Sequence, residues 1–253
     1  MEKIIANIVS QEPLANDIYN MVIRVPSMTK EAKAGQFVSL FSKDGSKLLP
    51  RPISICEIDK KAGTLRLVYR VAGSGTKEFS GLSDGTTIAV MGPLGNGFPL
   101  KKEKAIVIGG GIGIPPMLQL AKELDAEKSI VLGFRDETFL IKDFEAQAPV
   151  YISSEDGKTG VKGTVLNAIQ KYNIKGDIIY ACGPLPMLKA VKEYAKQKGI
   201  EAQISLEERM ACGIGACLAC TCNTEKKDEH SNINRKRICK EGPVFLAEEV
   251  ILS

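Results

Sequence analysis

The chain has 253 residues, 44% of them hydrophobic and 25% charged, and its net charge is +4 at pH 7. This length suits two compact domains with a small appendage, and the composition is that of an ordinary globular protein. The basic residues are scattered among acids, which argues against a nucleic-acid partner. The most apolar stretch, 105–120, contains four glycines and two prolines, so it is not expected to span a membrane.

Seven cysteines and a single histidine, His230, limit the chemistry available to the chain. The cysteine number is odd and residues 1–4 show no export signal, which favours a reducing compartment, expected to be cytoplasmic. The same features favour metal or redox chemistry over disulfides. One histidine leaves little room for histidine-based catalysis or a Rieske cluster. We therefore expect cofactors to carry the chemistry and no side chain to act as a catalytic acid or base.

The first hundred residues are predicted to form an antiparallel barrel, because short β-rich runs follow one another without a long helix. These runs are 4–9, 18–25, 37–41, 53–58, 64–69 and 86–90. Prolines on either side of Arg51 present its guanidinium as a rigid fork suited to a phosphate, with Ser54 three residues further. An exposed arginine at a strand start is the alternative. Gly73 and Gly75 precede a short helical pattern whose N-terminus could take an anion.

From residue 104 the pattern indicates a doubly wound parallel sheet. The apolar run 105–108 is typical of a strand buried on both faces, and further strands alternate with helices. The strands are 129–134, 150–153 and 177–181, and the helices are 117–124, 138–146, 163–172 and 187–198. The glycine-rich turn 109–113 would let a phosphate approach the backbone, although Ile114 or Pro116 replaces the final glycine of the Rossmann fingerprint. Cys182 follows a strand where such sheets bind ligands, or is a small buried residue at a turn.

A cysteine-rich segment near the C-terminus carries the most specific pattern. Four and then two residues separate its first three cysteines and a fourth follows later, the spacing of plant-type [2Fe–2S] ligation. The candidate ligands are Cys212, Cys217, Cys220 and Cys239. Structural zinc and free thiols are the alternatives, but zinc sites usually use two Cys-x-x-Cys pairs and only one is present. Gly213 and Gly215 would let backbone amides turn toward the sulfurs. Cys222 is not needed as a fourth ligand. Using it in place of Cys220 would lengthen the Cys-x-x-Cys spacing that begins at Cys217 to Cys-x-x-x-x-Cys.

The order of these motifs resembles the ferredoxin–NADP reductase superfamily. Within it, residues 211–220 and 239–245 resemble the electron-transfer subunits of type B dihydroorotate dehydrogenases, and the resemblance covers essentially the whole chain. It implies a Greek-key FAD-binding β-barrel domain over 1–99, an NAD-binding α/β domain over 100–203 and a [2Fe–2S] domain over 204–253. The segment 221–238 departs from the family by its length and charge.

The resemblance also assigns residues to cofactors. FAD would have Arg51 on its phosphates and Ser54 near the isoalloxazine, and the other FAD residues would be Pro52, Ile53, Val68, Tyr69, Arg70, Gly75 and Thr76. NAD(H) would be held by Gly110, Gly111, Ile112, Gly113, Pro115, Cys182, Gly183 and Pro184. The cluster would be held by the four candidate cysteines. NADH is preferred over NADPH by resemblance, because Arg135 and the acidic pair at 155–156 point in opposite directions.

The implied function is electron transfer in pyrimidine (UMP) biosynthesis. A partner subunit containing FMN would oxidise dihydroorotate, and electrons would pass through the cluster and FAD to NAD+ in a heterotetramer of two copies of each chain. A nicotinamide exchanges electrons in pairs and a cluster one at a time, so a flavin must connect them. The alternatives are a sulfide dehydrogenase, hydrogenase or ferredoxin:NAD(P) oxidoreductase complex, or a zinc-stapled nucleotide-binding regulatory module.

Overall fold

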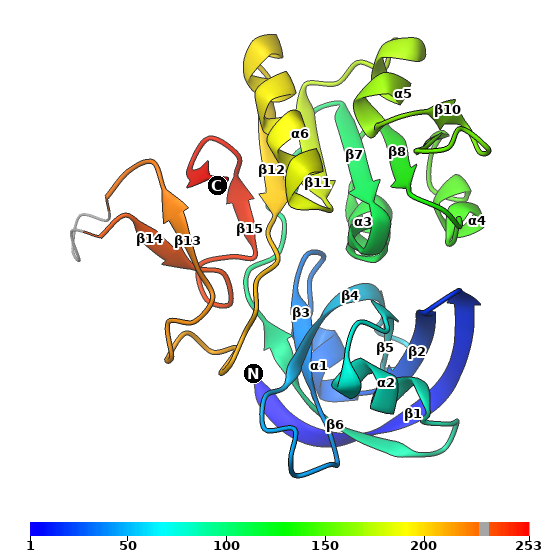
Figure 1. Cartoon of the computed structure of the whole chain (residues 1–253), viewed down its shortest axis with the longest axis vertical. Helices are drawn as coiled ribbons and strands as arrows, with labels where there is room; N and C mark the ends of the chain where they lie inside the picture. The colour runs from blue at the N-terminus through cyan, green and yellow to red at the C-terminus, as the bar shows by residue number, and fades with distance from the viewer. Residues whose placement is uncertain (228–232, 253) are drawn as a thin grey trace.

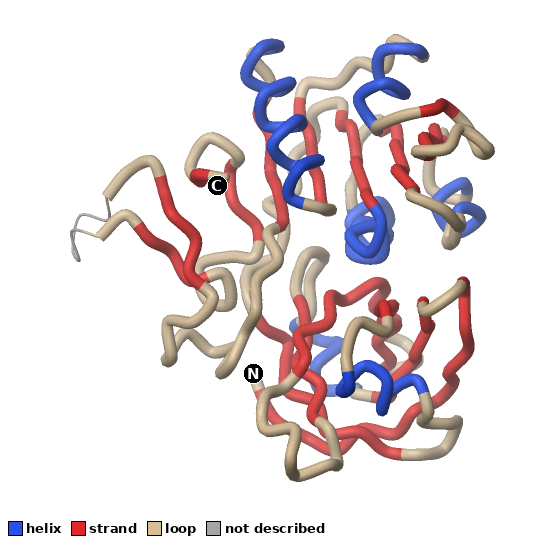
Figure 2. The backbone as a smooth tube through the Cα atoms, in the orientation of Figure 1, coloured by secondary structure: helices blue, strands red, loops and turns tan. Residues whose placement is uncertain are grey.

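The computed structural model describes residues 1–227 and 233–252. Figure 1 shows three parts: an N-terminal barrel, a sheet flanked by helices, and a small C-terminal region beside both. A long loop after residue 205 runs down beside the barrel before the chain returns as a strand at residue 221 (Figure 2). No helix of the described residues has both the length and the apolar character needed to cross a bilayer. His230 lies outside the described residues.

The N-terminal part is a closed antiparallel barrel with the strand order β1-β2-β5-β4-β3-β6. Its strands are β1 (Glu2–Ala15), β2 (Ile18–Arg24), β3 (Phe37–Phe41), β4 (Arg51–Asp59), β5 (Thr64–Arg70) and β6 (Thr87–Leu94). Inward-facing apolar side chains fill it with one buried core. The predicted barrel is confirmed. β1 is longer than predicted because its first half pairs with β6 and its second half with β2.

Two short helices accompany the barrel, α1 (Pro26–Glu31) and α2 (Ser74–Ser80). α2 is the short helix predicted after Gly73. The sequence pattern does not predict α1, because six residues are too few to show a helical period. Pro26 stands in the first turn of α1, where its missing N–H costs no hydrogen bond.

The middle of the chain forms most of a seven-stranded sheet in the order β10-β9-β8-β7-β11-β12-β15. Its strands are β7 (Ala105–Gly110), β8 (Lys128–Phe134), β9 (Val150–Ser154), β10 (Val161–Lys162), β11 (Ile178–Cys182), β12 (Glu201–Ser205) and β15 (Val244–Leu246). All neighbours are parallel except β15 with β12. The helices are α3 (Ile114–Glu123) and α4 (Ile141–Glu145) on one face, and α5 (Val165–Lys171) and α6 (Leu185–Lys198) on the other. The predicted doubly wound sheet is confirmed.

The C-terminal region is connected to both larger parts. It contains a small sheet of β14 (Arg235–Arg237), β13 (Thr221–Thr224) and β16 (Val250–Ile251). β12 crosses the boundary expected between residues 203 and 204, and β15 extends the middle sheet by pairing with β12. On the barrel side, the N–H of Asn96 donates to the carbonyl of Gly242 at 2.6 Å. The C-terminal region is therefore fixed between the barrel and the sheet.

Candidate functional site

A cavity of about 800 Å³ lies where the three parts meet. Most of the residues predicted to contact a flavin line it, from β4, β5 and α2. They are Arg51, Pro52, Ile53, Ser54, Val68, Tyr69, Arg70 and Thr76. Its opposite wall is the segment 205–210 that leads from β12 to the first cysteine, and Ile112 adds a contact from the middle sheet. One cavity thus touches the barrel, the sheet and the cysteine-rich segment.

Arg51 is packed directly against the backbone of Gly75. A Cβ atom on Gly75 would lie 2.2 Å from Nε and 2.6 Å from Cζ of Arg51, so this position accepts no side chain while the guanidinium stays in place. Arg51 Nη1 also donates to the carbonyl of Leu49. Gly75 does not line the cavity, and its role is to give the arginine room. The structure thus brings together two residues that the sequence places 24 positions apart.

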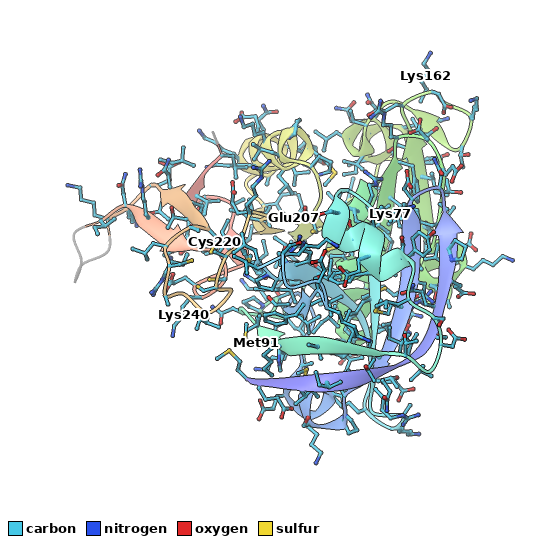
Figure 3. All side chains as sticks on the ribbon, turned by 60° about the horizontal axis from the view of Figure 1, so that its bottom comes forward. Lys77, Met91, Lys162, Glu207, Cys220 and Lys240 are labelled. Atoms are coloured by element: carbon cyan, nitrogen blue, oxygen red, sulfur yellow. The ribbon has the colours of Figure 1, made fainter. Side chains whose placement is uncertain are left out.

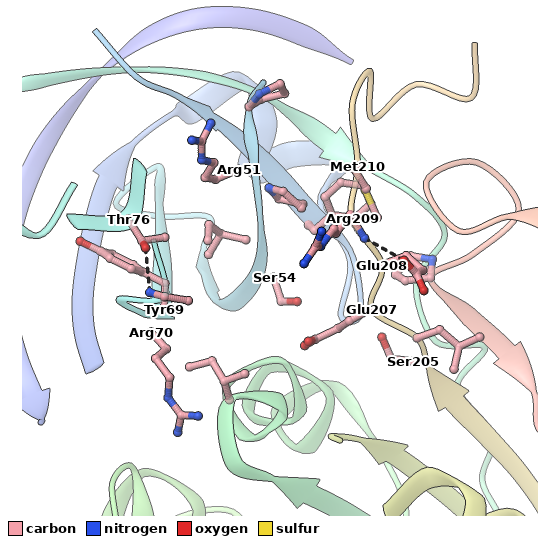
Figure 4. A pocket seen from close by; sticks show the side chains of 18 of the residues that line it. Arg51, Ser54, Tyr69, Arg70, Thr76, Ser205, Glu207, Glu208, Arg209 and Met210 are labelled. Carbon is pink, nitrogen blue, oxygen red and sulfur yellow. Dashed lines mark hydrogen bonds between the residues drawn. The ribbon is translucent and has the colours of Figure 1, made fainter. Parts of the chain in front are cut away.

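Thr76 and Tyr69 shape this wall through contacts within the barrel. Thr76 Oγ1 accepts hydrogen bonds from the N–H groups of Ala72 (2.9 Å) and Gly73 (3.2 Å), which fixes the turn before α2 (Figure 4). The Tyr69 ring is buried against Tyr19, with ring centroids 6.0 Å apart, and burial raises the pKa of its hydroxyl. Both residues therefore line the cavity and also help to fix its shape.

The sequence pattern does not predict the wall opposite the barrel. Ser54, Glu207 and Arg209 point into the cavity from its two sides (Figure 4). The Glu207 side chain is open to the cavity but enclosed by protein on its other sides, and this desolvation raises the pKa of its carboxyl. The signal was present in the sequence, because residues 208–210 begin the cysteine motif. Nothing local, however, shows that this segment faces the barrel.

The two segments predicted to bind a dinucleotide lie against each other. The turn after β7 and the turn after β11 follow neighbouring parallel strands, at the place where the strand order of the sheet reverses. A Cβ on Gly113 would lie 2.5 Å from the Cys182 carbonyl carbon, so glycine is required there for close packing. In open α/β sheets ligands bind at such a reversal.

Most of the predicted dinucleotide residues do not reach the cavity. Only Ile112 lines it, whereas Gly110, Gly111, Gly113, Pro115, Cys182, Gly183 and Pro184 are absent from its wall. The Cys182 thiol is fully buried, stands opposite Ser205 in the β11–β12 pairing, and has its pKa raised by desolvation. This burial matches the alternative interpretation of Cys182, that of a small buried residue at a turn.

The four candidate cysteines are arranged as two pairs. Cys217 N–H donates to Cys212 Sγ and Cys239 N–H donates to Cys220 Sγ, each at 3.4 Å. Each iron of a [2Fe–2S] cluster takes two cysteine ligands, so two pairs match a two-iron site. The donor set fits an iron–sulfur cluster.

Backbone amides point at the sulfurs, as expected for a cluster loop. Cys212 Sγ accepts from the N–H groups of Ile214 (3.5 Å) and Cys217 (3.4 Å), and Cys239 Sγ accepts from Gly215 N–H at 3.1 Å. Positive φ angles at residues 213 and 215, of 70° and 84°, make this turn possible. Although desolvation acts in the opposite direction, these amides lower the pKa of Cys212 to about 6. The loop is therefore built to hold a thiolate.

Arg237 contacts the segments that carry the cysteine pairs, whereas Cys222 makes a separate contact. Arg237 Nη1 donates to the carbonyl of Gly215 at 2.9 Å, and its guanidinium pairs with Glu241, so it connects the cluster loop to the turn that carries Cys239. Cys222 instead lies on β13, where its thiol donates to the Lys236 carbonyl at 3.6 Å. The structure thus keeps Cys222 apart from the two pairs.

Two family models match parts of the chain. Residues 6–98 match the model of the oxidoreductase FAD-binding domain, and residues 207–251 match that of the iron–sulfur cluster binding domain of dihydroorotate dehydrogenase B. Solved structures are similar too. A chain of an NADH-dependent reduced ferredoxin-NADP oxidoreductase, studied for flavin-based electron bifurcation, is 30% identical with a TM-score of 0.88, covering 98% of this chain and 90% of that one. Phthalate dioxygenase reductase shares the fold at 17% identity, with a TM-score of 0.62 and coverage of 96% and 97%.

Curated relatives extend over nearly the whole chain. The dihydroorotate dehydrogenase B (NAD(+)) electron transfer subunit of Caldanaerobacter subterraneus subsp. tengcongensis is 41% identical over 251 residues, which is 98% of both chains. The protein of the same name from Bacillus cereus is 40% identical over 255 residues, covering 97% of each. The chain therefore belongs to the family of dihydroorotate dehydrogenase B (NAD(+)) electron transfer subunits.

Proposed function

We propose that this chain passes electrons between a dihydroorotate-oxidising partner subunit containing FMN and NAD+, through a [2Fe–2S] cluster and FAD. Two copies of each subunit would form a heterotetramer in the cytoplasm, serving pyrimidine biosynthesis. Family membership and the matched FAD and iron–sulfur domains support this proposal. The observation that carries it is the single cavity bounded by the barrel, the sheet and the segment leading to Cys212.

We assign residues 1–99 to the FAD domain, and the cavity residues of β4, β5 and α2 to the flavin. The Arg51 guanidinium, held beside Gly75, would bind the FAD phosphates, because a planar fork suits a phosphate. Ser54 points into the cavity toward the segment 205–210 and would lie at the isoalloxazine end. When bound, FAD exchanges electron pairs with a nicotinamide and single electrons with an iron–sulfur cluster. The residues of the chain bind and orient the groups.

We assign residues 100–203 to the dinucleotide domain, with NAD(H) beside the two turns at the strand reversal. Asp136 follows β8, the second strand of this sheet, where an acidic residue can bind the ribose hydroxyls of NAD. The Asp156 carboxylate is already engaged in its own turn, because it accepts from Lys158 N–H at 2.9 Å. The position of Asp136 and the NAD(+) in the names of the curated relatives support NADH over NADPH, whereas the engaged Asp156 adds nothing to this preference.

We assign residues 204–253 to the cluster domain, with electrons entering from the partner subunit on the side of Cys217. Cys217 is exposed whereas Cys220 and Cys239 are buried. Next to it Leu218 is 61% exposed, and Ile214 is 41% exposed. Apolar side chains around an exposed ligand would suit a partner subunit that covers them. This face is therefore the proposed docking site for the catalytic subunit.

The experiment is anaerobic co-expression of the chain with its genomic neighbours, followed by visible spectroscopy of the purified complex. We expect flavin bands, a broad iron–sulfur shoulder, and bleaching on addition of either NADH or dihydroorotate. A complex reduced by NADH but never by dihydroorotate would contradict the assignment of the partner. Colourless protein with stoichiometric zinc would contradict the electron-transfer function altogether.

The similarity to a ferredoxin-NADP oxidoreductase chain favours a second candidate, in which the partner oxidises reduced ferredoxin. The cavity and the cysteine pairs would serve that partner equally well, because neither contacts a substrate other than the coenzyme. Reduction of the purified complex by ferredoxin, with no response to dihydroorotate, would favour this candidate.

A further inference from the structure

One buried hydroxyl beside the cysteine loop has no hydrogen-bond partner. Ser39, on β3, is 0% exposed, and its Oγ has no partner among the described residues. An unsatisfied buried hydroxyl is destabilising, so such a group calls for an acceptor that the protein atoms do not provide.

Ser39 faces the cluster loop. Along β3, Val38 points into the barrel core whereas Phe37 belongs to the core shared with the C-terminal region, and Ser39 follows Val38 on the outer face. A Cβ on Gly213 would lie 3.1 Å from Ser39 Oγ, and Gly213 is the residue directly after Cys212. Met91, which Figure 3 labels, is the neighbour of Ser39 on β6.

The rest of this contact is apolar. The same point on Gly213 is approached by Leu94 Cδ1 at 3.5 Å and by Met91 Cε at 3.9 Å. The ladder partners of Ser39 are Met91 on one side and Pro52 on the other, and neither side chain is a strong acceptor. The hydroxyl therefore lies without a partner in an apolar contact, beside Gly213, which stands between two ligands of the proposed cluster in the sequence.

We propose that Ser39 donates a hydrogen bond from the barrel to sulfur at the Cys212 end of the cluster and thereby raises the reduction potential of the cluster. The proposal rests on the proposed function, because it requires a cluster held by the four cysteines. Reduction adds negative charge to the sulfurs, so a donor aimed at them stabilises the reduced state more than the oxidised state. Ser39 is thus a positioning and tuning residue and not a catalytic one.

The test measures the reduction potential of the cluster in the intact purified complex by redox titration with EPR detection. A hydrogen bond to a charged acceptor contributes roughly tenfold to an equilibrium constant. Ser39→Ala should therefore make cluster reduction about tenfold less favourable, a shift of about 59 mV to lower potential for one electron. Ser153→Ala is the matched control, because Ser153 is equally buried and unpartnered among the described residues but lies on β9.

A second pair of variants separates the hydroxyl from packing. Ser39→Thr and Ser39→Val have nearly the same volume, so they share any crowding against Gly213 and differ in the hydroxyl. Threonine should keep the wild-type potential, and valine should show the shift of the alanine variant. Fe–S stretching bands in resonance Raman spectra should change in D2O for wild type and Ser39→Thr only.

The outcomes distinguish this inference from the proposed function. Protein without inorganic sulfide would overturn both. Clusters of equal potential and equal deuterium sensitivity in wild type and Ser39→Ala would overturn the hydrogen bond while leaving the electron-transfer function intact. In cluster-free protein Ser39→Ala should not lower the melting temperature, because the hydroxyl has no partner there. A marked loss would indicate a structural role and contradict the proposal.

Discussion

At the scale of single residues, the position of Arg51 depends on the absence of a side chain at Gly75. Gly73, two residues earlier, has open space around it: no atom lies within 4 Å of a Cβ placed there, and its φ of −168° is extended backbone. The two glycines look alike in the sequence, yet only Gly75 is in contact with the guanidinium. This difference allows a matched test of the proposed phosphate site.

Gly75→Ala should weaken FAD binding about tenfold, because a methyl group would displace the guanidinium from its place beside α2. Gly73→Ala should leave the affinity within about twofold of wild type. Titration of flavin-depleted protein with FAD, monitored by flavin fluorescence, measures the FAD affinity of both variants. Equal affinities for the two variants would show that Arg51 does not bind the phosphates in the position seen here.

At the scale of secondary-structure elements, Glu78 on α2 holds the loop between β3 and β4. Its carboxylate accepts from Lys47 Nζ and from Lys43 N–H, each at 2.8 Å, and from the Ser42 hydroxyl. The hydrogen bond from Lys47 is the main cause that lowers the pKa of Glu78 from 4.5 to about 2. The loop leads directly into Arg51, so this ion pair supports the wall of the cavity.

Glu78→Gln should lower the stability of the protein at pH 7 by about 1 kcal/mol or less, since the pair is near the surface. The folded-state pKa is depressed, so the stabilisation by Glu78 is present above pH 4.5 and is lost as the pH falls toward about 2. Urea unfolding of both proteins across this range measures the effect. A stability difference that persists unchanged at pH 2 would contradict this assignment.

The loop and the turn that carry the cysteines are joined by Arg237. Removing it in Arg237→Ala should shorten the lifetime of the visible iron–sulfur absorbance in air roughly tenfold, because two charge-assisted contacts are lost. Arg235→Ala, an exposed arginine on the same strand, is the control and should behave as wild type. Identical bleaching rates for all three proteins would show that Arg237 does not secure the cluster loop.

At the scale of the whole molecule, the flavin cavity and the cysteine pairs are separate sites connected by the segment 205–212. The barrel and the sheet form most of the cavity without the cysteines. The cluster loop in turn packs on β3 and β6 through Gly213. Damage to the cluster should therefore spare the exchange of electrons between coenzyme and flavin.

Cys217→Ser should abolish the cluster and electron delivery to the partner, while NADH still reduces FAD at a rate within about twofold of wild type. Stopped-flow measurement of flavin bleaching by NADH, together with iron and sulfide analysis, tests both halves. Cys222→Ser should retain the cluster, because Cys222 lies on β13 apart from the two pairs. Loss of FAD in Cys217→Ser would argue against two separate sites.

Local sequence was enough to predict the barrel strands, the alternating sheet and the four candidate ligands. Strand periodicity, glycine turns and cysteine spacing are properties of neighbouring residues, so they can be read along the chain. The helix α1 was missed because six residues are too few to show a helical period. The strand predicted over 4–9 was too short, because β1 pairs with β6 along its first half and with β2 along its second.

Only the tertiary structure shows which distant segments of the chain face each other. The sequence does not show that Glu207 and Arg209 face the barrel, that β15 completes the middle sheet, or that the four cysteines lie in two neighbouring pairs. It also gives no sign that Ser39 meets Gly213, because 174 positions separate them. Such contacts arise from the packing of distant segments, and the sequence pattern around each residue carries no information about its partner.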